Sequence, residues 1–266
     1  MAEVAGETVV VVRGMEVLVE GVAGNLRLCS LEAARAFGEN PIFVAQEGTE
    51  LWYAARARPG LELPAGLSFS PARPLFAELP EATMHLVGRA LACVEFEETH
   101  RYCGRCATPT EPGPVPIVST PLLAIERVRV CPNCGLSFHP RIPPAVIVLV
   151  ERGTELLLAR GANFPPGLFS AVAGFVEIGE SLEQAVHREV QEEVGVQITD
   201  VRYFSSQPWP FGHSLMIGFH ARYAAGQLKA DGVEIVEAGW FERDALPSLP
   251  PPISIARKLI EEFLAR

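Results

Sequence analysis

Three glutamates in the C-terminal half have the spacing of neighbours on a helix. Glu189, Glu192 and Glu193 stand at positions i, i+3 and i+4, so their carboxylates project from one side. Ser181 is a natural N-cap for that helix, and Gly195 is well placed to end it. Because like charges repel at this spacing, such a face is either solvated or neutralised by divalent cations. The triplet alone favours the solvated face.

Four cysteines form a second group, with the spacing of a metal site. Cys103 and Cys106 make one C-x2-C pair, and Cys131 and Cys134 make another. Two such turns can present four thiolates tetrahedrally to Zn²⁺, and four thiolates leave no open position for catalysis. The pattern predicts one structural zinc ion per chain. Two redox-active dithiols and a chance arrangement are the alternatives.

The glutamates belong to a longer pattern. Residues 174–196 match G-x5-E-x7-R-E-U-x-E-E-x-G-U, where U is a bulky aliphatic residue, at every specified position. On this match the chain resembles the Nudix hydrolases, which cleave a nucleoside diphosphate linked to another moiety. The resemblance implies an α/β/α sandwich in which Glu189, Glu192 and Glu193 hold catalytic Mg²⁺ or Mn²⁺. Glu193 is also a candidate for activating water, and Arg188 is expected to orient the glutamates.

A proline-rich stretch narrows the resemblance. Residues 206–214 read SQPWPFGHS, which by composition alone predicts a surface loop with one anchoring tryptophan. The stretch is similar to the S-Q-P-W-P-F-P-x-S array of the NADH pyrophosphatase branch, which also carries a four-cysteine zinc ribbon directly before its Nudix domain. Membership of this branch implies that the array lines a dinucleotide pocket with Gln207, Pro208, Trp209, Pro210, Phe211, Gly212, His213 and Ser214.

The branch also implies site residues outside these motifs. Glu234 is expected to be a further metal ligand, and Ala173 to offer a metal its backbone carbonyl. Phe175 is expected to stack on the nicotinamide ring, and Ala256 to form a close-packed wall against the substrate. Three more residues that match substrate contacts of the branch are Arg73, Glu126 and His139.

Two positions depart from the pattern of the branch. Gly212 replaces the third proline of the array, which loosens the backbone but removes no chemical group. His139 replaces a tyrosine that contacts the substrate from the partner subunit, and it adds a titratable group. The sequence therefore leaves the choice among NADH, NAD⁺ and other dinucleotides open.

The pattern of residues 1–98 predicts a smaller α+β domain, and we expect it to serve as scaffold or dimer surface. A helical stretch covers residues 30–38, whereas the Pro/Gly-rich residues 59–74 exclude regular helix and residues 75–98 return to a helical pattern. Cys29 and Cys93 are expected to be core residues. Strand-like runs occupy residues 8–12, 16–19, 42–45 and 51–54.

The remaining residues complete an α/β protein of three domains. After the N-terminal domain, residues 99–141 form the zinc ribbon, where arginines outnumber acidic residues. Residues 142–266 form the Nudix domain, which opens with two strands at 145–150 and 155–159.

Composition and charge limit the possible functions. Of 266 residues, 48% are hydrophobic and 20% charged, which indicates a globular protein. The net charge of −10 disfavours indiscriminate binding of nucleic acid. The longest aliphatic run, residues 145–150, is too short to span a bilayer, and the acidic N-terminus does not resemble a signal peptide. With six cysteines, we expect reduced thiols and a cytoplasmic protein.

The resemblance implies a homodimeric NAD(H) diphosphatase that splits NADH or NAD⁺ into nicotinamide mononucleotide and AMP, and that also removes NAD caps from RNA 5′ ends. One alternative is a Nudix pyrophosphatase for ADP-ribose or a diadenosine polyphosphate. The other is a zinc-ribbon adaptor with a retired Nudix domain, which the intact glutamate motif disfavours.

Overall fold

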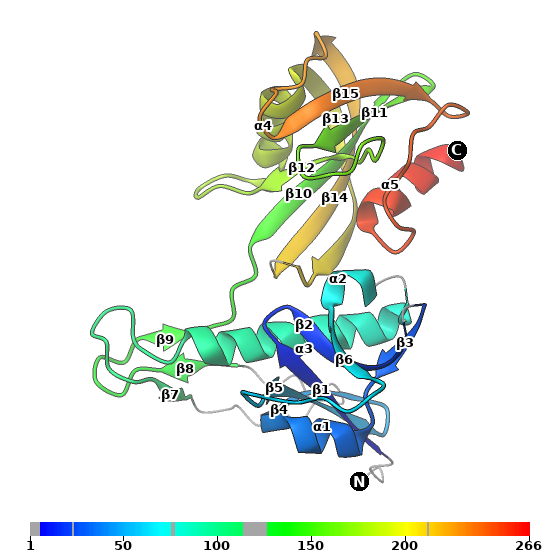
Figure 1. The fold of residues 1–266 in the computed structure, drawn as a ribbon. Coiled ribbons are helices and arrows are strands. Elements are labelled where there is room, and N and C mark those ends of the chain that lie inside the picture. Colours follow the sequence, from blue (N-terminus) through cyan, green and yellow to red (C-terminus); the bar gives the residue numbers. More distant parts are fainter. Residues whose placement is uncertain (1–5, 23, 76–77, 114–126, 212) are drawn as a thin grey trace. The chain divides into compact units, whose positions relative to one another are not determined.

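The computed structural model describes residues 6–22, 24–75, 78–113, 127–211 and 213–266 (Figure 1). The chain divides into two compact units. The first comprises Met1–Arg141 with Pro210–His213, and the second comprises Ile142–Trp209 with Ser214–Arg266. The three-domain division at residues 98 and 141 stays a prediction. Within the described ranges, none of the helices has the length and apolar character needed to cross a membrane.

The first unit is built on a six-stranded sheet in the order β3-β2-β1-β5-β4, with β6 paired to β2. β1 and β5 run parallel, whereas the other pairs are antiparallel. The four strands predicted in this region are confirmed as parts of β1, β2, β4 and β5. The strand bounds are Gly6–Arg13 (β1), Glu16–Val22 (β2), Asn25–Leu28 (β3), Gly38–Glu47 (β4), Glu50–Ala57 (β5) and Leu67–Pro71 (β6).

Three helices accompany this sheet. α1 (Leu31–Phe37) packs on β1 and β4, and the long α3 (Glu81–Thr99) packs on β5, β4 and β1. The prediction that residues 59–74 exclude regular helix is wrong at its end, because the single-turn α2 (Ala72–Leu75) forms there. Its proline lies within the first turn, where no helical N–H is needed. Cys29 and Cys93 are buried, as expected for core residues.

The cysteine-bearing segment forms a three-stranded antiparallel sheet of β7 (Glu111–Pro112), β8 (Arg129–Val130) and β9 (Ser137–Phe138). Arg129 attaches this sheet to the end of α3. Its guanidinium donates to the carbonyls of His100 and Thr110 and forms an ion pair with Glu97. The ribbon is therefore held by charge-assisted hydrogen bonds as well as by its cysteines.

The second unit contains a mixed sheet in the order β13-β14-β10-β11-β15, with β12 paired to β10. β10 and β14 run parallel and the other pairs are antiparallel. The predicted hairpin at residues 145–159 is confirmed as β10 and β11. The strand bounds are Pro144–Arg152 (β10), Glu155–Gly161 (β11), Val172–Phe175 (β12), Val196–Trp209 (β13), Ser214–Gly226 (β14) and Ile235–Glu242 (β15).

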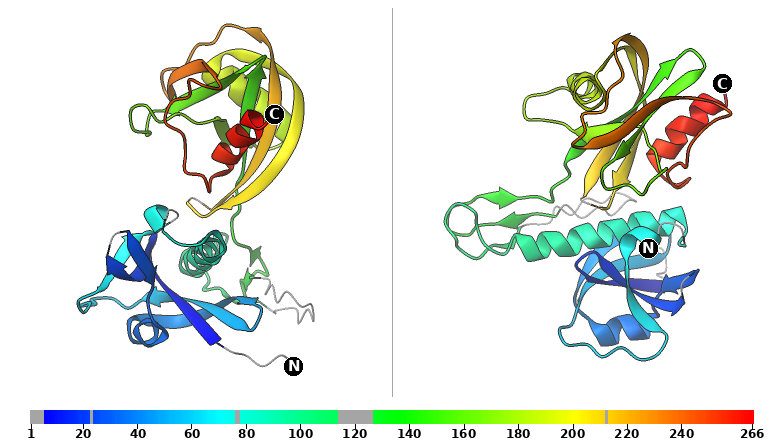
Figure 2. Two further views of the ribbon diagram at one scale, coloured as in Figure 1. Left: turned by 90° about the vertical axis from the view of Figure 1, so that its right-hand side faces the viewer. Right: turned by 45° about the horizontal axis from the view of Figure 1, so that its top comes forward.

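Both faces of this sheet are covered, as the side chains of β10 show. Val146 and Val148 belong to a core that includes residues of α4 (Leu182–Val194). Ile147 and Leu149 belong to a second core that includes residues of α5 (Ile255–Leu264). Figure 2 shows the two helices on opposite faces of the sheet. The predicted α/β/α sandwich is therefore confirmed.

The sequence signals at the ends of α4 also hold. Ser181 Oγ accepts from the Gln184 N–H at 3.2 Å, and Gln184 Oε1 accepts from the Ser181 N–H at 2.8 Å, which completes a capping box. Gly195 ends the helix with a φ of 71°, a left-handed conformation that favours glycine. These two ends fix the rotation at which α4 presents its glutamates.

Candidate active site and metal centres

The three glutamates of α4 differ in exposure. Glu189 and Glu193 are 8% and 6% exposed, so their carboxylates turn into the unit, whereas Glu192 is exposed. Glu193 Oε2 is buried and has no hydrogen-bond partner among the described residues. A buried carboxylate oxygen without a donor is costly, and it is a natural ligand for a hard cation.

Burial and neighbouring acids shift the titration of this pair. Burial, together with the charges of Glu189, Glu234 and Asp231, raises the pKa of Glu193 to about 8. Burial also raises the pKa of Glu189, while hydrogen bonding to Arg188 opposes that change. A divalent cation would favour the ionised form of both groups, so the donor set fits Mg²⁺ or Mn²⁺.

Arg188 organises the surroundings of the glutamates. Its guanidinium donates to both carboxylate oxygens of Glu180, at 2.8 and 2.9 Å, and to Glu189 Oε1 at 2.8 Å. It also donates to Glu192 Oε2 at 3.1 Å and to the Phe175 carbonyl at 2.9 Å. Arg188 therefore binds three carboxylates at once, which is the arrangement expected of a residue that orients them.

Gly174 makes room for one of the buried carboxylates. A Cβ at this position would lie 2.0 Å from the carboxylate carbon of Glu189, closer than any tolerated contact. Ala173, whose backbone carbonyl is an expected metal ligand, precedes Gly174 on β12 and is half-buried. Phe175 follows Gly174 and its side chain is 57% exposed. β12 therefore brings two expected site residues, Ala173 and Phe175, next to α4.

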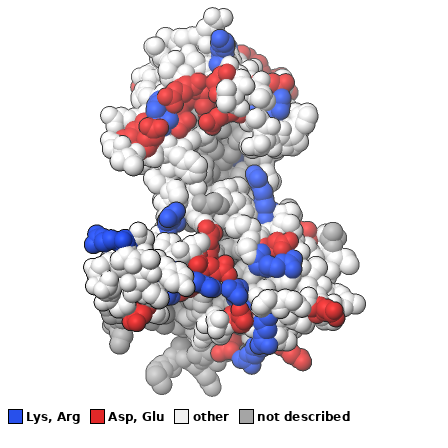
Figure 3. All heavy atoms as spheres, turned by 60° about the vertical axis from the view of Figure 1, so that its left-hand side comes forward, with Lys and Arg blue, Asp and Glu red and all other residues white. Residues whose placement is uncertain are grey.

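Glu234 reaches the site from the segment before β15. Its charge raises the pKa of both Glu189 and Glu193, so its carboxylate lies near theirs. Figure 3 shows acidic side chains gathered on one face of this unit. Among the described residues, only the four cysteines bring three or more possible ligand atoms within 4.8 Å of one another, so metal binding by Glu189, Glu192, Glu193 and Glu234 stays a prediction.

The proline-rich array is not a simple loop, contrary to what its composition predicts. Gln207, Pro208 and Trp209 end β13, and Ser214 begins β14 opposite Trp209. Residues 210–213 belong instead to the first unit, where His213 pairs with Glu95 of α3. Strands β13 and β14 were not predicted, because the prolines and the glycine of the array read as turn signals.

Two of the expected pocket residues, Gln207 and Ala256, make contacts at the start of α5. The Gln207 amide donates to the Ile253 carbonyl and accepts from the Ile255 N–H, both at 2.8 Å, so it anchors the start of α5. Ala256 is 6% exposed and packs in the core beneath α5. Gln207 is thus a positioning residue for that helix.

The other expected substrate contacts lie in the first unit. Arg73 is exposed on α2, and His139 is exposed directly after β9. Pro210 is buried and Phe211 is half-buried. Glu126 and Gly212 lie outside the described residues. The substrate contacts assigned to all these positions stay predictions.

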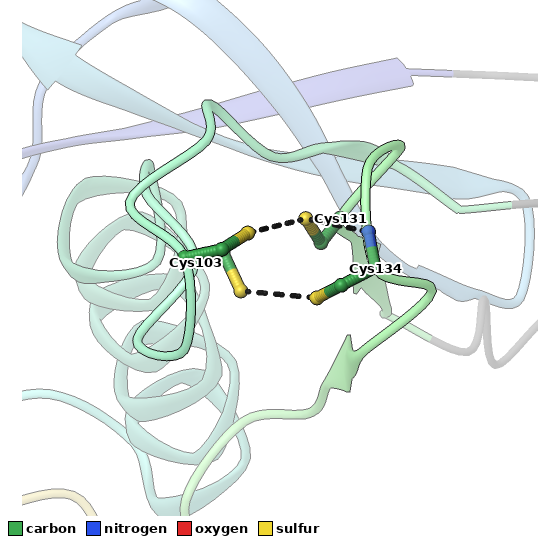
Figure 4. A group of neighbouring side chains, drawn as sticks. Cys103, Cys131 and Cys134 are labelled. Carbon is green, nitrogen blue, oxygen red and sulfur yellow. Dashed lines mark hydrogen bonds between the residues drawn. The ribbon is translucent and has the colours of Figure 1, made fainter.

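The four cysteine sulfurs converge with the geometry of a tetrahedral site (Figure 4). Cys103 Sγ lies 3.6 Å from Cys134 Sγ, Cys106 Sγ lies 3.5 Å from Cys131 Sγ, and all four lie within 4.8 Å of one another. Zinc bound by four sulfurs at about 2.3 Å requires sulfur separations of about 3.8 Å. The cluster therefore fits a metal ion of that size.

Backbone and side-chain donors support thiolates in this cluster. The Arg105 N–H points to Cys103 Sγ at 3.4 Å, and the Cys134 N–H points to Cys131 Sγ at 3.5 Å. Hydrogen bonding by Thr108 lowers the pKa of Cys106 to about 5, whereas for Cys134 a bond from the Leu136 backbone lowers the pKa but burial and bonding to the other cysteines raise it to about 11. None of the six cysteines, all within the described ranges, forms a disulfide. A metal site is favoured over two redox dithiols.

Comparison with known proteins identifies the domain formed by the second unit. Residues 141–263 match the model of the NUDIX domain, so the second unit is a Nudix domain. Among solved structures, a NUDIX hydrolase from Nitrosomonas europaea is 23% identical and has a TM-score of 0.47, with coverage of 62% of this chain and 89% of that chain.

Two relatives are similar over most of their length. Both carry the name NAD-capped RNA hydrolase NudC. The protein from Chromobacterium violaceum is 46% identical, over 90% of this chain and 83% of its own length. The protein from Deinococcus radiodurans is also 46% identical, over 77% of this chain and 71% of its own length. The chain belongs to this NudC family of Nudix hydrolases, which confirms the resemblance to the NADH pyrophosphatase branch.

Proposed function

We propose that the protein hydrolyses the central pyrophosphate bond of NADH and NAD⁺ to nicotinamide mononucleotide and AMP, and that it removes NAD caps from RNA 5′ ends. The observation that carries this proposal is the buried pair Glu189 and Glu193, with its unpartnered oxygen, in a chain whose relatives are named as NAD-capped RNA hydrolases. A retired domain would have no reason to keep two carboxylates buried at such a cost.

The proposed metal ligands are the carboxylates of Glu189, Glu192, Glu193 and Glu234 and the carbonyl of Ala173. Mg²⁺ or Mn²⁺ held by these groups would offset the charge of the pyrophosphate and polarise a phosphorus centre. Arg188 keeps the Glu189 and Glu192 carboxylates in place during this chemistry. Glu193 has a carboxylate oxygen without a hydrogen-bond partner among the described residues, which suits it to accept a proton from the attacking water once a bound cation keeps it ionised.

The proposed substrate pocket combines stacking and shape. Phe175 has an exposed ring and a backbone fixed by Arg188, so it is available to stack on nicotinamide. Trp209, Ser214 and the rest of the array line the pocket, and Ala256 shapes its wall. Contacts from outside the Nudix domain are proposed for Arg73, Glu126 and His139.

The assembly and environment follow from the same family. We place Zn²⁺ in the four-cysteine cluster as a structural ion, because the sulfurs fit tetrahedral coordination. The protein is proposed to be a homodimer in which residues 1–98 serve as scaffold or dimer surface. Six unpaired cysteines suit a reducing cytoplasm.

Product analysis tests the proposed reaction. NADH, NAD⁺, NAD-capped RNA, ADP-ribose and diadenosine tetraphosphate would be supplied at matched concentration with Mn²⁺. We expect AMP and nicotinamide mononucleotide from the first two, and 5′-monophosphate RNA from the third. Preference for ADP-ribose or the diadenosine compound would refute the substrate assignment. No turnover of any substrate by zinc-loaded protein would favour the adaptor alternative.

A further inference from the structure

The loop between β14 and β15 carries a carboxylate that the proposed function does not use. Asp231 Oδ1 accepts hydrogen bonds from the N–H groups of Val233 at 3.2 Å and Ile235 at 2.8 Å. Its Oδ2 accepts from the Glu234 N–H at 3.1 Å. These backbone donors, led by Glu234, hold the pKa of Asp231 below its ordinary value. The side chain therefore orders the loop as a carboxylate.

The same loop is bonded to the elements on either side of the site. The Asp231 N–H donates to the Glu193 carbonyl at 3.0 Å, and the Lys229 N–H donates to the Val194 carbonyl at 3.0 Å. The Ala162 N–H donates to the Glu234 carbonyl at 2.9 Å. Asp231 thus links the last turn of α4 to the backbone N–H of Glu234. Ala162, which follows β11, binds the backbone carbonyl of Glu234.

This arrangement matters because Glu234 has little else to hold it. Its side chain is exposed, yet its charge acts on both buried glutamates. An exposed glutamate on a free loop would lose rotamer and backbone entropy on binding a cation. Fixing its backbone beforehand removes part of that loss. Gly232, with a φ of 79°, allows the tight turn that closes the loop.

We propose that Asp231 is a positioning residue that holds Glu234 in register with Glu193 for metal binding. This inference rests on the proposed role of Glu234 as a metal ligand. Asp231 is not a ligand itself, because its two carboxylate oxygens face three backbone N–H groups. It is linked to the site through Glu234 and through the backbone of α4.

A double-mutant cycle tests the proposal by metal binding, without reference to turnover. Mn²⁺ affinity would be measured from the electron paramagnetic resonance signal of free Mn²⁺, with zinc retained in the ribbon. The variants are Asp231→Ala, Asp231→Asn, Glu234→Gln and the Asp231→Ala/Glu234→Gln pair. Asp244→Ala removes another exposed aspartate of the same unit as a matched control. Thermal unfolding of each variant reports on folding.

Asp231→Ala should weaken Mn²⁺ binding about tenfold, at the lower end of the range for outer-shell residues. Asp231→Asn should recover part of that loss, because its remaining oxygen can still accept from Val233 and Ile235. Glu234→Gln should also weaken binding, and the double variant should bind no more weakly than Glu234→Gln alone. Asp244→Ala should bind like the wild type.

Three outcomes overturn the inference. Additive losses in the double variant would mean that Asp231 acts on the metal independently of Glu234. Wild-type affinity in Asp231→Ala, with a lower unfolding temperature, would reduce Asp231 to a structural role. Wild-type affinity in Glu234→Gln would leave Asp231 nothing to position. NADH hydrolysis measured on the same proteins separates these results from failure of the proposed function.

Discussion

Replacing Glu193 with glutamine should make the metal-free protein more stable at alkaline pH while abolishing its response to Mn²⁺. Glutamine keeps the size of the side chain and removes the charge that burial penalises. In the wild type, the buried carboxylate must ionise beside Glu189, Glu234 and Asp231. The variant avoids the free-energy cost of ionising a buried carboxylate. It also lacks the carboxylate that would bind Mn²⁺.

The magnitude follows from the pKa of Glu193. Its ordinary value of 4.5 is raised to about 8 in the folded protein. For a raised pKa, the favourable contribution is fully present below the unfolded value and is lost as the pH rises through the folded value. At about 1.4 kcal/mol per pKa unit, the free energy of unfolding should fall by roughly 3–5 kcal/mol between about pH 4.5 and about pH 9 through this group.

The assay is thermal or urea unfolding at several pH values, in buffer free of Mg²⁺ and Mn²⁺, with the ribbon zinc retained. Glu183→Gln, an exposed position on the same helix, is the matched control because it removes the same charge without unburying anything. The wild type and this control should lose stability in parallel from pH 6 to 9, whereas Glu193→Gln should lose less. Mn²⁺ should raise the unfolding temperature of the first two proteins alone.

Proton competition gives a second measure of the same group. Below about pH 8, where folded Glu193 is protonated, each decrease of one pH unit should weaken Mn²⁺ binding by up to about tenfold. NADH hydrolysis by Glu193→Gln should fall at least about 10²-fold. If stability–pH curves of the wild type and Glu193→Gln run parallel, the carboxylate is not held at a cost, and the reasoning from burial fails.

Three further predictions concern other parts of the fold. Gly174→Ala should displace the Glu189 carboxylate and lower kcat for NADH by at least about tenfold, and wild-type turnover would contradict the close contact. Elemental analysis should find one zinc ion per chain in the wild type and none in Cys131→Ser, and this variant should also lose about 3 kcal/mol or more of ribbon stability. Gln207→Ala should cost about 1–3 kcal/mol in urea unfolding, because it leaves a carbonyl and an N–H at the start of α5 without their partner.

Local signals predicted the parts of the site that depend on neighbouring residues. The cap at Ser181, the end at Gly195 and the helical spacing between them are short-range, and the structure shows all three. The two C-x2-C pairs likewise converge as their spacing indicates. In these places each residue's conformation is set mainly by residues within a few positions along the chain.

The rest depended on contacts that spacing does not reveal. The helical spacing placed Glu192 and Glu193 on one side of the helix, but only the second is buried, in contact with the elements that pack on α4. Gln207 matched a pocket residue by resemblance, yet its amide bonds to a segment nearly fifty residues away. The link between Asp231 and the backbone of Glu193 joins residues 38 positions apart, and no local pattern in the sequence predicted it.

The alternating side chains of β10 have a consequence for how this domain can change. Consecutive residues of this strand serve different cores, with Val146 and Val148 behind the helix that carries the glutamates and Ile147 and Leu149 behind α5. Insertion or deletion of one residue would exchange both sets at once, so the strand's length is rigidly constrained. Substitutions face no such restriction. The core residues that pack against α5 can therefore be substituted without changing the core residues that pack against α4.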